Sequence, residues 1–105
     1  MTREDIWSLL VGEEMDVTVG YHVIGLRTHP SLYPEYSTDI AAAWEVNKKM
    51  MSYLFSTRMR YFELIQESVS RRKLFDGEII SYPDILMFIE PEDFCRAALL
   101  AVYDA

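Results

Sequence analysis

The chain has 105 residues, of which 50% are hydrophobic and 13% aromatic, so it can form one folded domain over residues 1–105 and is not a disordered chain. Its formal net charge of −7 makes binding to a nucleic-acid backbone unfavourable. No apolar run approaches the ~20 residues of a membrane-spanning helix. With one cysteine, Cys95, and no export signal, we expect a cytoplasmic protein.

Two helices are predicted near the N-terminus. Thr2 can cap the first, Asp5 stands where it completes a capping box, and Gly12 can end the helix. The second begins at Glu13. Its apolar positions recur at helical spacing, at Met15, Val19, His22 or Val23, and Leu26. A loop over residues 25–36 should follow, because Pro30 and Pro34 interrupt regular structure.

That loop carries two aromatic residues, Tyr33 and Tyr36. It can hold a binding site or close over the core as a flap, and the aromatic residues favour the flap because such side chains usually serve burial. The strongest helical pattern begins next, with Ser37 or Thr38 as N-cap. The residues predicted to share the mainly apolar face of this helix are Ile40, Ala43, Trp44, Asn47, Met51 and Leu54. We expect Trp44 to be buried, and Asn47 to need a hydrogen-bond partner if it is buried too.

Beyond Arg58 the pattern favours strands. Residues 59–66 are rich in β-forming residues, with Phe62 and Leu64 assigned to one face. Asp76-Gly77 is a hairpin signal, and residues 85–89 form a short apolar run typical of a buried strand. Helices followed by strands and a final helix predict an α+β fold, a layered α-β-α sandwich with a short antiparallel sheet.

Pro91 at the first helical position starts the last helix. From Phe94 to Val102 this helix is apolar on nearly every side, with Cys95 among the residues expected to be buried. Such a helix must be covered by the sheet, by another helix or by a partner chain. In so small a domain this predicts a homo-oligomer, most simply a two-fold dimer.

Two segments, residues 36–46 (YSTDIAAAWEV) and 94–102 (FCRAALLAV), resemble the signature helices of the phage ABA sandwich domain family. Residues 12–16 match more loosely. The resemblance implies an α-β-α fold, signature helices near residues 38–52 and 91–103, and a phage or prophage origin. It implies no activity and no catalytic residues. The chain departs from the family in its loop before the first signature, which is not rich in tryptophan, and between residues 68 and 83.

No catalytic or metal-binding set is evident, and we expect neither enzymatic activity nor a cofactor. The chain has two histidines, His22 and His29, seven residues apart. A zinc site needs three or four ligands that converge on the metal, so these two do not predict one. Cys95 could pair with a histidine as a nucleophile, but its apolar helix favours an inert buried thiol. Ser37 and Thr38 could bind an anion at a helix start, but an N-cap explains them fully and Asp39 opposes an anion there, so the N-cap is favoured.

The charge is uneven: residues 48–73 carry a net +5 between two acidic ends. This stretch can balance the ends within the fold or meet an anionic ligand. The candidate ligand-binding residues are Arg58, Arg60, Arg71, Arg72 and Lys73, with Tyr33 or Tyr36 stacking on a base. The favoured hypothesis is a non-enzymatic phage or prophage accessory protein that binds a host or phage protein and modulates a host process or defence. The alternative is a protein that sequesters a small anionic ligand such as a nucleotide signal.

Overall fold

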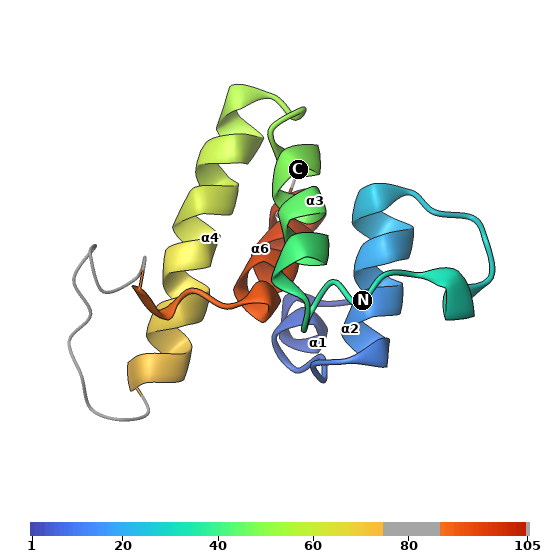
Figure 1. Ribbon diagram of the computed structural model, residues 1–105. Helices are drawn as coiled ribbons and strands as arrows, with labels where there is room; N and C mark the ends of the chain where they lie inside the picture. The colour runs from blue at the N-terminus through green and yellow to red at the C-terminus, as the bar shows by residue number, and fades with distance from the viewer. Residues whose placement is uncertain (75–86, 105) are drawn as a thin grey trace.

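The computed structural model describes residues 1–74 and 87–104, and every regular element in these two ranges is helical (Figure 1). The α-helices are α1 (Arg3–Trp7), α2 (Glu13–Val19), α3 (Ile40–Met50), α4 (Phe55–Leu74) and α6 (Pro91–Asp104). A π-helical turn, Gly20–Ile24, extends α2, and a short 3-10 turn covers Pro30–Leu32. The expected α+β sandwich with an antiparallel sheet is therefore wrong for the described part of the chain.

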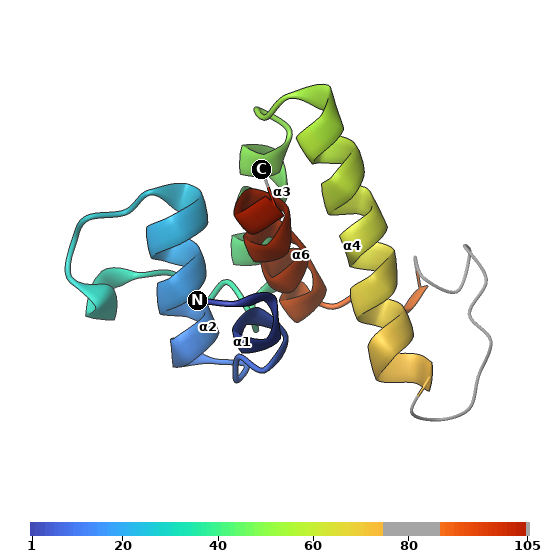
Figure 2. The ribbon, with the colours of Figure 1, turned by 180° about the vertical axis from the view of Figure 1, so that it is seen from behind.

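The centre of the fold is α6. In Figure 1 it lies behind α3, with α4 on one side and α2 on the other, and Figure 2 shows the same arrangement from behind. Its small side chains, such as Ala97 and Ala98, are fully buried and allow the surrounding helices to approach closely, while Leu100 fills the space between them. The expectation that this helix is buried on several sides is confirmed, and the chain's own helices provide the cover.

The predicted strand at residues 59–66 lies within α4. Tyr61, Leu64, Ile65, Ser68 and Val69 are all buried. Their spacing of three and four residues is that of one helix face. The β-forming residues of this segment were misleading because burial against α6 outweighs intrinsic strand propensity. Phe62 and Leu64, assigned to one face of a strand, differ in the helix: Leu64 is buried and Phe62 is exposed.

The other strand signals fall mostly outside the described residues. The hairpin predicted at Asp76-Gly77 and the first two residues of the run 85–89 belong to the range 75–86. Met87 and Phe88, within that run, form part of a helical turn and not a strand. The two helices of the family resemblance do occur, as α3 and α6, at the expected places.

Hydrogen bonds fix the start of α2 to the start of α3. Ser37 donates both its backbone N–H and its hydroxyl to Asp16 Oδ1, each at 2.7 Å. The Ser37 hydroxyl also accepts from the N–H of Gly12 at 2.8 Å. Ser37 therefore is not the N-cap of α3; that role belongs to Asp39, whose carboxylate accepts from the N–H of Ala41. Gly12 does not end α1 but precedes α2 with a φ of 117°, a conformation that favours glycine.

The predicted start of the first helix is confirmed, although its predicted end at Gly12 is wrong. Thr2 caps α1, and Asp5 completes the capping box by accepting from the Thr2 N–H at 2.7 Å. The same hydrogen bonds lower the pKa of the Asp5 carboxyl below its usual value. The short α1 packs against α6, and its Ile6 side chain is buried in the core.

Candidate functional site

The first feature of the site is an exposed apolar row along α3. Ile40, Trp44 and Met51 recur at the spacing of one helix face, and all three are exposed. Trp44 is 50% exposed, although its ring packs edge-on against Phe94 with centroids 6.2 Å apart. The expectation that Trp44 is buried is therefore wrong. The core side of α3 is formed instead by Ala43, Val46 and Met50.

A second exposed row lies along the first half of α4. Phe55, Met59 and Phe62 follow the same spacing on one helix face and are all exposed. Leu54, in the short connection from α3, is 80% exposed and stands between the two rows in sequence. Both helices therefore present apolar side chains in addition to those they contribute to the core.

The two rows meet at the seam between α3 and α4. Asn47 belongs to the α3 row, three residues after Trp44, and accepts a hydrogen bond from Tyr61 Oη at 3.0 Å. The α3 row therefore faces α4. Tyr61 in turn contacts the ring of Phe62, with centroids 5.6 Å apart. The α3–α4 face is defined by these rows and their connection: Ile40, Trp44, Met51, Leu54, Phe55, Met59 and Phe62.

Arg58 lies within the α3–α4 face. It is three residues after Phe55 and four before Phe62, so the three side chains are neighbours on the helix. Its guanidinium carbon is 5.7 Å from the centre of the Phe55 ring. Its Nε is buried and has no hydrogen-bond partner among the described residues. The residue as a whole is only partly buried, so the guanidinium on this apolar surface can still attract an anionic group.

The candidate ligand-binding residues do not come together in one place. Arg58 and Arg60 are on the first half of α4, whereas Arg71, Arg72 and Lys73 are at its other end, about 20 Å away at 1.5 Å per residue. The loop that carries the two tyrosines lies beyond α2, on the opposite side of α6 from α4 (Figures 1 and 2). Tyr36 is buried in the core, so its ring is not available to stack on a base.

Arg72 holds α4 to the start of α6. Its guanidinium bonds the Asp93 carboxylate through Nε, at 3.1 Å, and through Nη2, and it also donates to the Phe88 carbonyl at 2.7 Å. Asp93 is fully buried and accepts further bonds from Ser68 Oγ at 2.6 Å and from the Glu90 N–H at 2.8 Å. The hydrogen bond to Asp93 raises the pKa of Arg72 above its ordinary value. This arginine is structural in the fold.

A small hollow lies beside this ion pair. The hollow has a volume of about 240 Å³ and is lined by Trp7, Ser68, Arg71, Arg72, Glu92 and Arg96. Arg71 lies over the Trp7 ring at 3.8 Å from its centre. Glu92 forms ion pairs with two neighbours, at 3.1 Å from Arg72 Nε and 3.2 Å from Arg96 Nη1. We call this hollow the arginine pocket.

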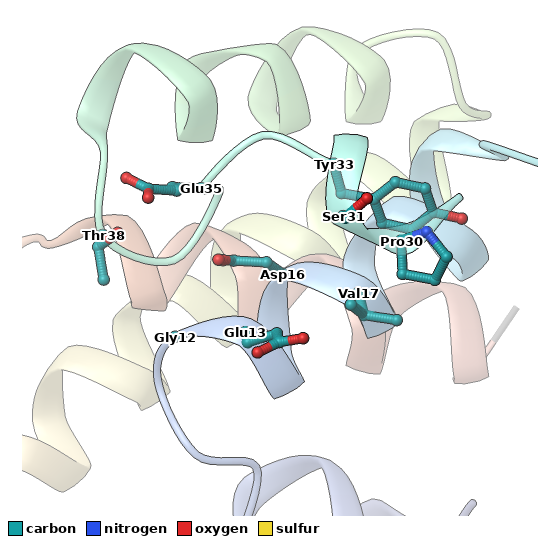
Figure 3. Close-up of a pocket in the computed structure, with 9 residues that line it drawn as sticks. All are labelled: Gly12, Glu13, Asp16, Val17, Pro30, Ser31, Tyr33, Glu35 and Thr38. Atoms are coloured by element: carbon teal, nitrogen blue, oxygen red, sulfur yellow. The ribbon is translucent and has the colours of Figure 1, made fainter. Parts of the chain in front are cut away.

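A larger and acidic hollow of about 410 Å³ lies between α2 and the loop that follows it (Figure 3). Glu13, Asp16 and Glu35 line it, but the Glu13 and Glu35 carboxylates point apart. Asp16 already accepts two hydrogen bonds from Ser37. No group of three or more acidic, histidine or cysteine side chains within the described residues could hold a metal ion.

Cys95 shows no sign of a catalytic role. The thiol is fully buried in α6, and burial raises its pKa well above the ordinary value, so the reactive thiolate is disfavoured. Of the two histidines, His29 caps the 3-10 turn by accepting from the Ser31 N–H, and His22 lies in the π-helical turn with its ring edge-on to Tyr21.

No protein-family model, curated protein or solved structure matches this chain. Among the described helices, none combines the length and the apolar character needed to cross a membrane. The α3–α4 face was missed in the sequence because residues 59–66 were assigned to a strand. The signal was present: on α4, Phe55, Met59 and Phe62 repeat at helical spacing beside the separate row of buried residues.

Proposed function

We propose that this protein acts by binding another protein through the α3–α4 face and catalyses no reaction. The observation that carries the proposal is the exposure of seven large apolar side chains on two adjacent helices and their connection. Single exposed apolar residues are common on protein surfaces, but a contiguous group of this kind marks an interaction site. Aromatic residues and methionine, which form most of the group, are enriched in protein interfaces.

The biological setting belongs to the same proposal. A phage or prophage accessory protein, acting in the cytoplasm of an infected or lysogenic cell on a host process or defence, is the setting that the family resemblance implies. This part rests on the sequence resemblance alone, because the sandwich fold that the same resemblance implied is wrong for the described residues.

Site-specific photo-crosslinking in the producing cell tests the proposal. A benzophenone side chain is placed at Phe62, which is 43% exposed on the face, and at Tyr21, a matched aromatic control that is 48% exposed on the other side of the fold. We expect a defined adduct from position 62, mapped by mass spectrometry to one segment of one partner, and none of that adduct from position 21. Equal labelling at both positions, or no adduct at position 62, rejects the proposal.

A second candidate function is the binding of a small anion at the arginine pocket. The favourable observation is that Arg71, Arg72 and Arg96 line one hollow together with the Trp7 ring. Adenosine monophosphate and inorganic phosphate are the probes, followed by amide chemical shifts. Binding should weaken at least about tenfold in Arg71→Gln and stay unchanged in Arg58→Gln, because only the first removes a charge from this pocket. If the amide chemical shifts do not change at millimolar concentrations of either probe, this candidate function is rejected.

A further inference from the structure

The charge around the α3–α4 face differs from that of the rest of the chain. Between Val46 and Phe62 there are four basic residues and no acidic residue, in a protein whose net charge is −7. Two of these cations are paired with carboxylates that flank the segment: Lys48 with Glu45 at 3.2 Å, and Arg60 with Glu63 at 3.3 Å. The corner where α3 ends and α4 begins is thus both apolar and basic, which complements an acidic apolar partner.

Arg58 is the residue of this face that most needs an acidic group from a partner. Any partner that covers Phe55 and Phe62 also covers Arg58, because the three residues share one helix face. A guanidinium that loses its water without gaining a counter-charge strongly disfavours binding. Its Nε is already buried and unpartnered within the described structure. A partner that fits this face must therefore bring a carboxylate to Arg58.

The shape of the face fits a helix. The α3 row runs from Ile40 to Met51, about 16 Å along the helix axis, and the α4 row from Phe55 to Phe62, about 10 Å. Two rows on adjacent helices, meeting at the seam between Asn47 and Tyr61, present a surface into which the side-chain ridge of a third helix can pack. About three turns of helix are enough to span the longer row.

A second copy of this chain is a poorer occupant. In a two-fold dimer the same patch meets itself, so the basic corner of one copy would face the basic corner of the other. Like charges brought together in this way disfavour association.

We infer that the α3–α4 face receives an acidic amphipathic helix of a different protein, with one carboxylate of that helix bound to Arg58. The inference rests on the proposed function and specifies its partner. The apolar side of the partner helix packs on the two rows, with anchors spaced three and four residues apart. The carboxylate lies at the border of this apolar side, where it reaches the guanidinium.

Selection from a displayed library of helical peptides, with both apolar and charged positions randomised, tests the inference. We expect enriched peptides to share apolar residues at helical spacing and an Asp or Glu beside them. Their binding to the wild-type protein should be lost in Phe55→Ser and Phe62→Ser variants that remain folded by circular dichroism. Enrichment of basic or extended peptides, or no enrichment, overturns the inference.

A double-mutant cycle on one enriched peptide isolates the carboxylate. Arg58→Gln should weaken binding at least about tenfold, and the peptide Glu→Gln should weaken it equally, while the two changes together should cost little more than either alone. Arg60→Gln is the matched control, since it removes the same charge from the same helix outside the row, and it should change binding less than threefold. Additive losses overturn the pairing with Arg58.

The crosslinking experiment separates this inference from the proposed function. An adduct from position 62 that maps to an acidic helical segment supports both. An adduct that maps to a basic or extended segment, or to a second copy of this chain, overturns the inference and leaves binding through the face intact. The absence of any adduct from position 62 rejects the proposed function itself.

Discussion

Asp93 is the residue on which the junction between α4 and α6 depends. Its buried carboxylate accepts hydrogen bonds from Ser68, from Arg72 and from the backbone of Glu90. Asp93→Asn keeps the shape but removes the charge opposite Arg72. We expect a loss of about 3 kcal/mol in the free energy of unfolding, measured by urea denaturation. Ser68→Ala, the control, removes one uncharged donor and should cost about 1 kcal/mol. A change below about 0.5 kcal/mol in Asp93→Asn would contradict this account.

Cys95 is predicted to be inert in the native protein. The thiol is fully buried and its pKa is raised by burial, so almost no thiolate exists near neutral pH. A thiol reagent should react with the folded protein far more slowly than with the same chain in denaturant. Fast modification of the native protein, with rates like those of a free thiol, would show that α6 opens or that the site is exposed.

Trp44 should matter less to stability than a core tryptophan would. Half of its surface is in water, and its main ring contact is with Phe94. Trp44→Ala should therefore cost about 1–2 kcal/mol, compared with about 2–5 kcal/mol for Leu100→Ala in the core. Thermal denaturation of the two variants provides the comparison, and a larger loss for Trp44→Ala would place that side chain in the core after all.

At the scale of elements, the loop after the π-helical turn is held down by one close packing contact. A Cβ added at Gly20 would lie 2.6 Å from Cδ2 of the Tyr33 ring, and the Tyr33 hydroxyl is anchored to the Leu26 carbonyl at 3.1 Å. Gly20→Ala should therefore displace Tyr33 and cost about 1–3 kcal/mol. The double variant Gly20→Ala/Tyr33→Ala should cost less than the sum of its two single variants, since the clash is gone. Strict additivity would argue against this contact.

The same scale shows where sequence reasoning succeeds and where it fails. Local signals were sufficient for the capping box at Thr2 and for the helices α3, α6 and α2, because caps and apolar spacing act over a few residues. They were insufficient for α4. Its two apolar rows lie on neighbouring sides of one helix, and in a short window such a double pattern resembles the alternation of a strand. Only packing against α6 decides between the two.

The candidate site shows a similar division. Sequence reasoning grouped basic residues by their nearness along the chain, yet Arg58 and Arg72 serve different ends of α4, one on an apolar face and the other in a buried ion pair. Trp44 was assigned to the core because its face also holds Ala43. Ala43 is buried and the next residue, Trp44, is half exposed. Helical spacing in the sequence does not show which of two such neighbouring side chains faces the core.

For the whole molecule, the oligomeric state follows from what covers α6. The dimer predicted from sequence was motivated by an apolar helix in need of cover, and α1, α2, α3 and α4 supply that cover within one chain. Self-pairing through the α3–α4 face would bring two basic corners together, which disfavours a dimer there. Sedimentation at micromolar concentration should therefore give a single 12.3 kDa species. A dimer at that concentration would contradict this expectation.

The central position of α6 also has a consequence for synthesis. The helix against which the other described helices pack is encoded after them, so α1 to α4 are synthesised before the element that completes their core. At translation rates of about 5–20 residues per second, the thirty residues between the ends of α4 and α6 take roughly 2–6 s to make. During that interval the apolar sides of the earlier helices have no α6 to pack against. The core of the described residues is therefore completed only once α6 is made.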